Sequence, residues 1–144
     1  MEKTNVRYLK EGDLPQLCDF ASVDVSFISL KLVLKPVWAL LKEHAPVAAL
    51  VKPQFEAGRE KVGKKGVVRD KAVHAEVIEK VEGFASDAGF LVRGLDFSPI
   101  TGPEGNIEYL LWLEKTDSEK EQAAPERETI LRVVEEAHLA HGKP

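Results

Sequence analysis

The stretch VAALVKPQFE, from Val47 to Glu56, constrains the fold of this chain more than any other. Its apolar first half has the length of a buried β-strand, and Pro53 ends that strand because proline offers no N–H to a sheet ladder. Lys52 therefore lies at the carboxyl end of a strand, where open α/β sheets hold their ligands. The loop that follows is cationic and contains Arg59, Lys61, Lys64, Lys65 and Arg69. We predict a site for a polyanion, with Lys52 at its floor.

The composition indicates a single globular domain. The chain has 144 residues, of which 44% are hydrophobic and 31% charged, and a net charge of −4. This charge argues against a generally basic nucleic-acid binder but permits a local basic patch. The single cysteine and four scattered histidines argue against a zinc site, so we expect no metal. No apolar run reaches the roughly 18–20 residues of a membrane span, and we expect a cytoplasmic protein outside the membrane.

Strands and helices are predicted to alternate along the chain. We predict strands at 20–27 (ending near Asp24), 47–52, 90–97 and 107–113, and helices at 30–44, at 71–88 and from Pro125 onward. Ser29 and Asp70 are suitable N-caps, while Pro36 predicts a kink or a second helix start. We expect Trp38 and Trp112 in the core and the histidines in solvated positions. The order β-α-β-α-β-β-α predicts an α/β domain with a mostly parallel sheet.

Three charged residues, Asp24, Lys52 and Glu108, lie at the ends of predicted strands. The carboxyl ends of parallel strands share one edge of a sheet, and an antiparallel strand would bring its first residues to the same edge. The three charged side chains could then meet in one crevice. A second interpretation stays open, in which each charge merely lies where a strand meets solvent. The cationic loop also has two interpretations, as an anion-binding loop or as a solvated loop.

Four sequence blocks carry a resemblance to a known family. The blocks DVSFISLKLVL, ALVKPQFEAGRE, GVVRDKAVH and SPITGPEGNIEYLLWL resemble the TlyA, or hemolysin A, type of FtsJ-like ribosomal RNA methyltransferases, which use S-adenosylmethionine. The resemblance runs from about Thr4 to Lys115 and includes the later VVEEAH. It implies a Rossmann-like methyltransferase sheet whose last strand is antiparallel. We expect a partial methyltransferase domain over residues 1–115, and a charged linker with a C-terminal helix over residues 116–144.

The resemblance also implies roles for individual residues. Asp24, Lys52 and Glu108 match three members of the family's Lys-Asp-Lys-Glu tetrad for ribose 2′-O-methylation. Asp24, with Thr4 and Asn5, would contact the methyl donor. Contacts to phosphates of ribosomal RNA would come from Arg59, Lys64, Lys65 and Arg69. Two acids near Lys52 favour its charged form, so we expect Lys52 to orient the ribose hydroxyl rather than to remove its proton.

Some parts of the family pattern have no counterpart in this sequence. These are the first tetrad lysine, the glycine-rich cofactor loop and the amino-terminal RNA-binding domain. We therefore expect a sheet that lacks its first strands, and an isolated chain that is inactive and binds little S-adenosylmethionine. Its open strand edge would be covered by an amino-terminal portion or by a second copy in a homodimer. A non-catalytic RNA-binding remnant is the first alternative, and a membrane-active hemolysin is a weaker one because no cationic amphipathic helix is evident.

Overall fold

The computed structural model describes residues 17–25, 29–58, 62, 66–102, 105–116 and 127–141. The elements are β1 (Ala21–Val23), η3 (Leu30–Leu32), α1 (Leu34–Ala39), β2 (Pro46–Val51), α2 (Pro53–Glu56), α3 (Lys71–Ala88), β3 (Phe90–Phe97), β4 (Tyr109–Lys115) and α4 (Arg127–His141). The predicted alternation of strands and helices is confirmed. Five residues with predicted roles lie outside the described residues, namely Thr4, Asn5, Arg59, Lys64 and Lys65.

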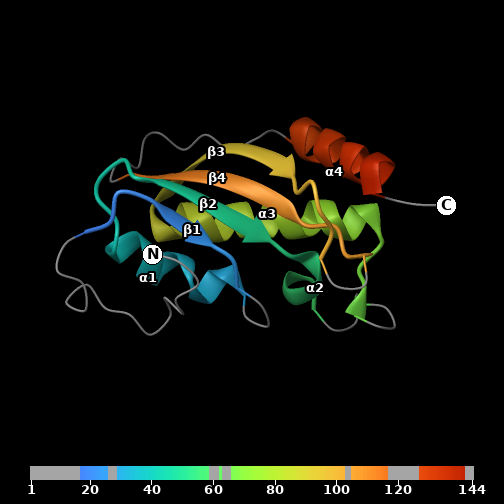
Figure 1. Cartoon of the computed structure of the whole chain (residues 1–144), viewed down its shortest axis with the longest axis horizontal. Helices are drawn as coiled ribbons and strands as arrows, with labels where there is room; N and C mark the ends of the chain where they lie inside the picture. The colour runs from blue at the N-terminus through green and yellow to red at the C-terminus, as the bar shows by residue number, and fades with distance from the viewer. Residues whose placement is uncertain are drawn as a thin grey trace.

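The four strands form one sheet in the order β1-β2-β4-β3. Strand β1 pairs parallel with β2, whereas β4 lies between β2 and β3 and is antiparallel to both. Three strands thus share a direction and the last strand of the sequence runs against them, as Figure 1 shows. This arrangement confirms the expected Rossmann-like sheet with its antiparallel last strand.

The helices pack against one face of the sheet. Alternate residues of β2 and β4 are buried on that face, which are Val47, Ala49, Val51, Tyr109, Leu111 and Leu113. In Figure 1 the sheet lies in front of α3, and α4 lies near the end of β3. The predicted apolar stripe of α4 is confirmed, because Ile130, Val133, Val134 and Ala137 are all buried. None of the described helices is long and apolar enough to span a membrane.

Trp112 corrects one expectation about the core. Its side chain is 43% exposed. Successive side chains of a strand point to opposite faces, so Trp112 points away from the face that buries Leu111 and Leu113. It lies instead against Gly94, at which an added Cβ would be 3.6 Å from the indole Cδ1. A large aromatic residue therefore marks the face of the sheet that the described helices leave open.

The boundaries of several elements confirm or correct the local predictions. Ser29 caps η3 and Asp70 caps α3, as expected. The helical segment after Ser29 breaks at Val33 rather than at Pro36, so that Pro36 lies in the first turn of α1, where its missing N–H is not needed. Strand β4 starts two residues later than predicted and extends through Lys115. The predicted solvation of His74 is also wrong, since this side chain is fully buried.

Candidate active site

Lys52 and Asp24 form an ion pair at one end of the sheet. Asp24 follows β1 and Lys52 follows β2, and these parallel strands end on the same side. The Lys52 Nζ atom lies 2.6 Å from Asp24 Oδ1, with the lysine side chain 12% and the aspartate side chain 51% exposed. The pair therefore fixes a nearly buried ammonium beside a carboxylate that is still open to solvent, where a ligand can approach.

Glu108 reaches the same end of the sheet from the antiparallel strand. The β2–β4 ladder ends with the pair Val51↔Tyr109, so Lys52 and Glu108 are the next residues outward on neighbouring strands. The Glu108 side chain is buried, and its Oε2 accepts a 2.9 Å hydrogen bond from Gln54 Nε2. The structure thus gathers Asp24, Lys52 and Glu108 at one edge.

Gly102 provides the space for the Glu108 carboxylate. A Cβ atom added at Gly102 would overlap the Oε2 atom of Glu108. The Gly102 N–H donates a 2.7 Å hydrogen bond to the Asn106 carbonyl. Gly102 thus lies directly against the Glu108 carboxylate. The turn-rich sequence between 98 and 106 predicted a loop but gave no sign of this contact.

Glu56 is a buried acid near the site that the sequence did not single out. Its carboxylate accepts a 2.7 Å hydrogen bond from Ser29 Oγ and a 2.8 Å bond from the Leu30 N–H. Burial raises the pKa of Glu56, and the hydrogen bonds from Leu30 and Ser29 oppose this change. Glu56 therefore joins α2, which follows Lys52, to the start of η3. The contact spans 26 residues, so no local pattern could have revealed it.

Arg69 is the one predicted RNA contact among the described residues. It is exposed and precedes Asp70, whose side chain accepts a 2.8 Å hydrogen bond from the Ala72 N–H and so caps α3. The guanidinium group of Arg69 can therefore meet a phosphate from solvent. In the part of the chain that the structure describes, no group of three His, Cys, Asp or Glu side chains could hold a metal ion.

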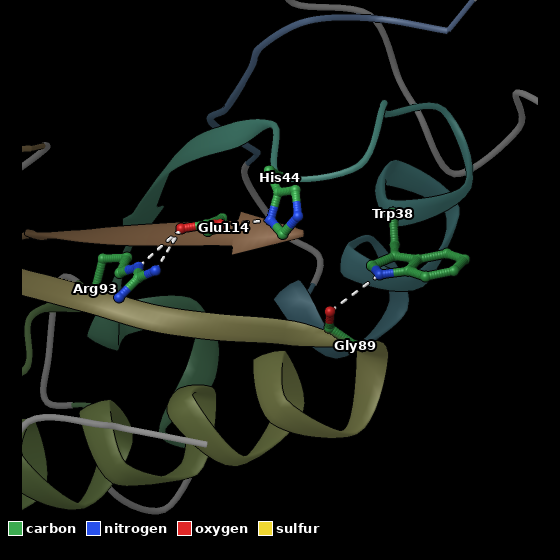
Figure 2. Close-up of polar contacts among 5 residues, drawn as sticks. All are labelled: Trp38, His44, Gly89, Arg93 and Glu114. Atoms are coloured by element: carbon green, nitrogen blue, oxygen red, sulfur yellow. Dashed lines mark hydrogen bonds and ion pairs between the residues drawn. The ribbon is translucent and has the colours of Figure 1, made fainter. Parts of the chain in front are cut away.

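The opposite end of the sheet holds a second polar cluster (Figure 2). Glu114 lies 2.9 Å from His44 Nδ1 and 2.8 Å from Arg93 Nη2. Hydrogen bonds from His44 and Arg93 lower the pKa of Glu114. The indole N–H of Trp38 donates a 3.0 Å hydrogen bond to the Gly89 carbonyl. These contacts join α1 to the C-cap of α3, and they join β3 and β4 to the segment before β2.

Known proteins resemble this chain over most of its length. The model of the FtsJ-like methyltransferase family matches residues 1–115. YqxC, a candidate rRNA methyltransferase of Bacillus subtilis, is 52% identical over 140 residues, which cover 96% of this chain and 50% of that protein. The 16S/23S rRNA (cytidine-2′-O)-methyltransferase TlyA of Mycobacterium tuberculosis is 40% identical over 113 residues, which cover 78% of this chain and 42% of that protein.

A solved structure shows the same fold. A candidate hemolysin from Streptococcus thermophilus superposes with a TM-score of 0.89 at 50% identity, over 97% of this chain and 50% of that chain. The chain spans about half the length of these relatives. Since the family model covers residues 1–115 and the relatives share up to 52% identity, the chain belongs to the FtsJ-like methyltransferase family.

Proposed function

We propose that this chain supplies the catalytic edge of an RNA 2′-O-ribose methyltransferase, which acts on ribosomal RNA with S-adenosylmethionine as methyl donor. The observation that carries the proposal is the 2.6 Å pair of Lys52 and Asp24, with Glu108 on the neighbouring strand. The TlyA relative is a cytidine-2′-O-methyltransferase of 16S and 23S rRNA, and this supports the same chemistry.

The three side chains suit the activation of a hydroxyl group. A ribose hydroxyl is a poor nucleophile until it is hydrogen-bonded to a base or loses its proton. Lys52, oriented by Asp24, donates a hydrogen bond to the hydroxyl oxygen and fixes the direction of its free lone pair. Glu108 accepts the hydroxyl hydrogen. With a methyl donor bound, the oxygen would form a bond to the methyl carbon while the methyl–sulfur bond breaks to leave a neutral thioether, and the hydroxyl proton would pass to the Glu108 carboxylate.

The donor site fits the same edge. S-adenosylmethionine supplies a methyl group on a cationic sulfonium, which a nearby carboxylate stabilises. The Asp24 side chain is half exposed and can face such a cation while it holds Lys52. Thr4 and Asn5 are proposed to contact the adenine of the donor. The glycine-rich cofactor loop of the family has no counterpart in this sequence, so we propose that the 144-residue chain alone binds the donor weakly.

Substitution of Lys52 tests the catalytic proposal. The protein is expressed from the longest open reading frame that contains this sequence, and transfer of a labelled methyl group to ribosomal RNA is measured. Lys52→Ala is expected to reduce the rate at least about 100-fold, because an oriented hydrogen-bonding group is lost. Donor affinity, measured by calorimetry, should not change. Lys35→Ala, at an exposed position of α1, is the matched control and should retain full activity.

The outcomes separate the proposal from its alternatives. Full activity in Lys52→Ala would remove Lys52 from the mechanism. Methylation at a base rather than at a ribose hydroxyl, detected as an alkali-labile product linkage, would contradict the 2′-O assignment. RNA binding without methyl transfer by the wild-type protein would indicate the non-catalytic RNA-binding alternative.

A further inference from the structure

The backbone of Val68 is held on both sides by side chains from other elements. Its N–H donates a 3.0 Å hydrogen bond to Asn106 Oδ1, and its carbonyl accepts a 2.8 Å bond from His74 Nε2. The Asn106 Nδ2 group also donates a 2.9 Å bond to the Gly66 carbonyl. Val68 and Asn106 are both buried, and Val68 immediately precedes Arg69. Side chains, rather than a sheet ladder, therefore fix the segment that leads to Arg69.

His74 makes a second connection, from Val68 to the start of β4. Its Nδ1 lies 2.8 Å from the hydroxyl of Tyr109, the first residue of β4. Burial lowers the pKa of His74 to about 4 and raises that of Tyr109, so both groups are neutral near pH 7. A neutral imidazole has one N–H, which the Val68 carbonyl requires at Nε2. The Tyr109 hydroxyl must then donate to Nδ1. The two hydrogen bonds therefore run in one direction, from Tyr109 through His74 to the Val68 carbonyl.

The two hydrogen-bonded connections to Val68 start from residues on either side of Glu108. Asn106 lies two residues before Glu108 and Tyr109 lies one residue after it, and both reach Val68. The segment Gly66–Val68 and the start of β4 thus form one rigid unit with Glu108 between its two attachments. No sequence pattern predicts this unit, because its Asn106 contacts join residues 38 and 40 positions apart.

We propose that Asn106 is a positioning residue that sets the separation between Arg69 and Glu108. This inference rests on the proposed function, in which Glu108 meets the ribose hydroxyl, and on the predicted contact of Arg69 with an RNA phosphate. The phosphate and the ribose of one nucleotide are joined covalently at nearly fixed distance, so both contacts form together only if the protein holds Arg69 and Glu108 at a matching distance. Asn106 is suited to this task because its single carboxamide binds two backbone groups of the segment before Arg69.

A double-mutant cycle on the 144-residue chain tests this inference. Binding of a fluorescein-labelled stem–loop of 23S rRNA is measured by anisotropy for Arg69→Ala, Asn106→Ala and the double variant. We expect each single variant to weaken binding by about 10-fold and to reduce the salt dependence by about one phosphate contact. We expect the double variant to bind no more weakly than Arg69→Ala, because Asn106 acts through Arg69.

Val133→Ala is the matched control for stability. Val133 is buried in α4 and contributes no side chain to the unit. This variant should lose stability by an amount comparable with Asn106→Ala but bind RNA as the wild type does. If Asn106→Ala does not fold, Asn106→Asp replaces it. The aspartate can still accept from the Val68 N–H but places an oxygen against the Gly66 carbonyl, and we expect the same non-additive loss.

The outcomes distinguish this inference from the proposed function. Asn106 variants that bind RNA like Val133→Ala, or effects that add in the double variant, would overturn the positioning role even if methyl transfer is observed. Coupled losses of RNA binding, without any methyl transfer by the protein expressed from the longest open reading frame, would retain the positioning role and reject the methyltransferase. A wild-type chain that does not bind the stem–loop would overturn the inference.

Discussion

The two ends of the sheet each hold a lysine at a strand end, and their surroundings differ. Lys115, at the end of β4, donates a 2.6 Å hydrogen bond to the Leu41 carbonyl and lies 3.9 Å over the ring of Trp38. Both partners are neutral, and the lysine is buried. Lys52, after β2, instead pairs with the half-exposed carboxylate of Asp24. A lysine enclosed by neutral groups serves the fold, whereas one beside an accessible carboxylate can serve chemistry.

Helix α3 connects the two ends, and two buried titratable residues on it have opposite pKa shifts. Burial lowers the pKa of His74 from 6.5 to about 4. Burial, and then the charge of Glu79, raises the pKa of Glu82 from 4.5 to about 7. His74 contributes stability that is present above pH 6.5 and is lost as the pH falls to about 4. Glu82 contributes stability that is present below pH 4.5 and is lost as the pH rises to about 7.

The largest expected effect follows from these opposite shifts. Each shift is equivalent to about 3 kcal/mol, so the two contributions offset one another between pH 4 and 7. Glu82→Gln removes one of them. The free energy of unfolding of Glu82→Gln should equal that of the wild type near pH 4. Above pH 7 it should exceed that of the wild type by about 3 kcal/mol. Urea denaturation at a series of pH values measures this difference, and a difference independent of pH would show that Glu82 is solvated.

The second effect compares the two lysines directly. Lys115→Met leaves the Leu41 carbonyl without its ammonium donor and removes the contact with Trp38, so we expect a loss of about 2–3 kcal/mol of stability. Lys52→Met should cost less than about 1 kcal/mol, because water can reach Asp24. Urea denaturation measures both values. RNA methylation should show the reverse order, and equal losses of methylation would mean that the two ends do not differ in function.

The third effect compares two glycines. Gly89 has a φ of 101°, and a Cβ there would lie 2.6 Å from Trp38 Nε1, so Gly89→Ala should cost about 1–2 kcal/mol through backbone strain and displacement of the indole. Gly102→Ala should cost less, because the Glu108 carboxylate that it displaces can rotate. It should nevertheless reduce methyl transfer. Thermal unfolding and the methylation assay separate these effects, and unchanged methylation in Gly102→Ala would mean that the position of Glu108 is not critical.

The smallest effect concerns Glu114, at the end of the sheet opposite to Lys52. Its hydrogen bonds with His44 and Arg93 lower its pKa, so it contributes stability that is present above pH 4.5 and is lost as the pH falls further. The arginine and histidine are exposed, so we expect Glu114→Gln to cost only about 0.5 kcal/mol at pH 7. High salt should reduce this cost. A salt-independent loss in urea denaturation would instead indicate a packing role for Glu114.

Local chemistry predicted most of the fold. The apolar run before Lys52 and Pro53 defined β2 to within one residue at each end, and Asp70 and Gly89 marked the two ends of α3. Local patterns failed where tertiary packing determines which residues are buried. Helix α3 contacts η3, α1, α4 and the sheet, so its buried face is wider than one apolar stripe and includes the polar residues His74 and Glu82.

The site was predictable only as far as strand ends define it. Asp24, Lys52 and Glu108 could be expected to meet because the direction of each strand sets which end its last or first residue reaches. Glu56 and Asn106 could not be found in this way, since their hydrogen bonds join distant segments. Neither residue departs from an ordinary local pattern, and only the three-dimensional arrangement reveals its partners.

The central position of β4 has a consequence for the order of folding. Strands β3 and β4 are neighbours in the sequence and can pair early, whereas β4 reaches β2 only by closing a chain segment of more than fifty residues. Glu108 meets Lys52 only in that slow, non-local step. The edge that holds Asp24, Lys52 and Glu108 therefore forms only after β4 has been synthesised and has paired with β2.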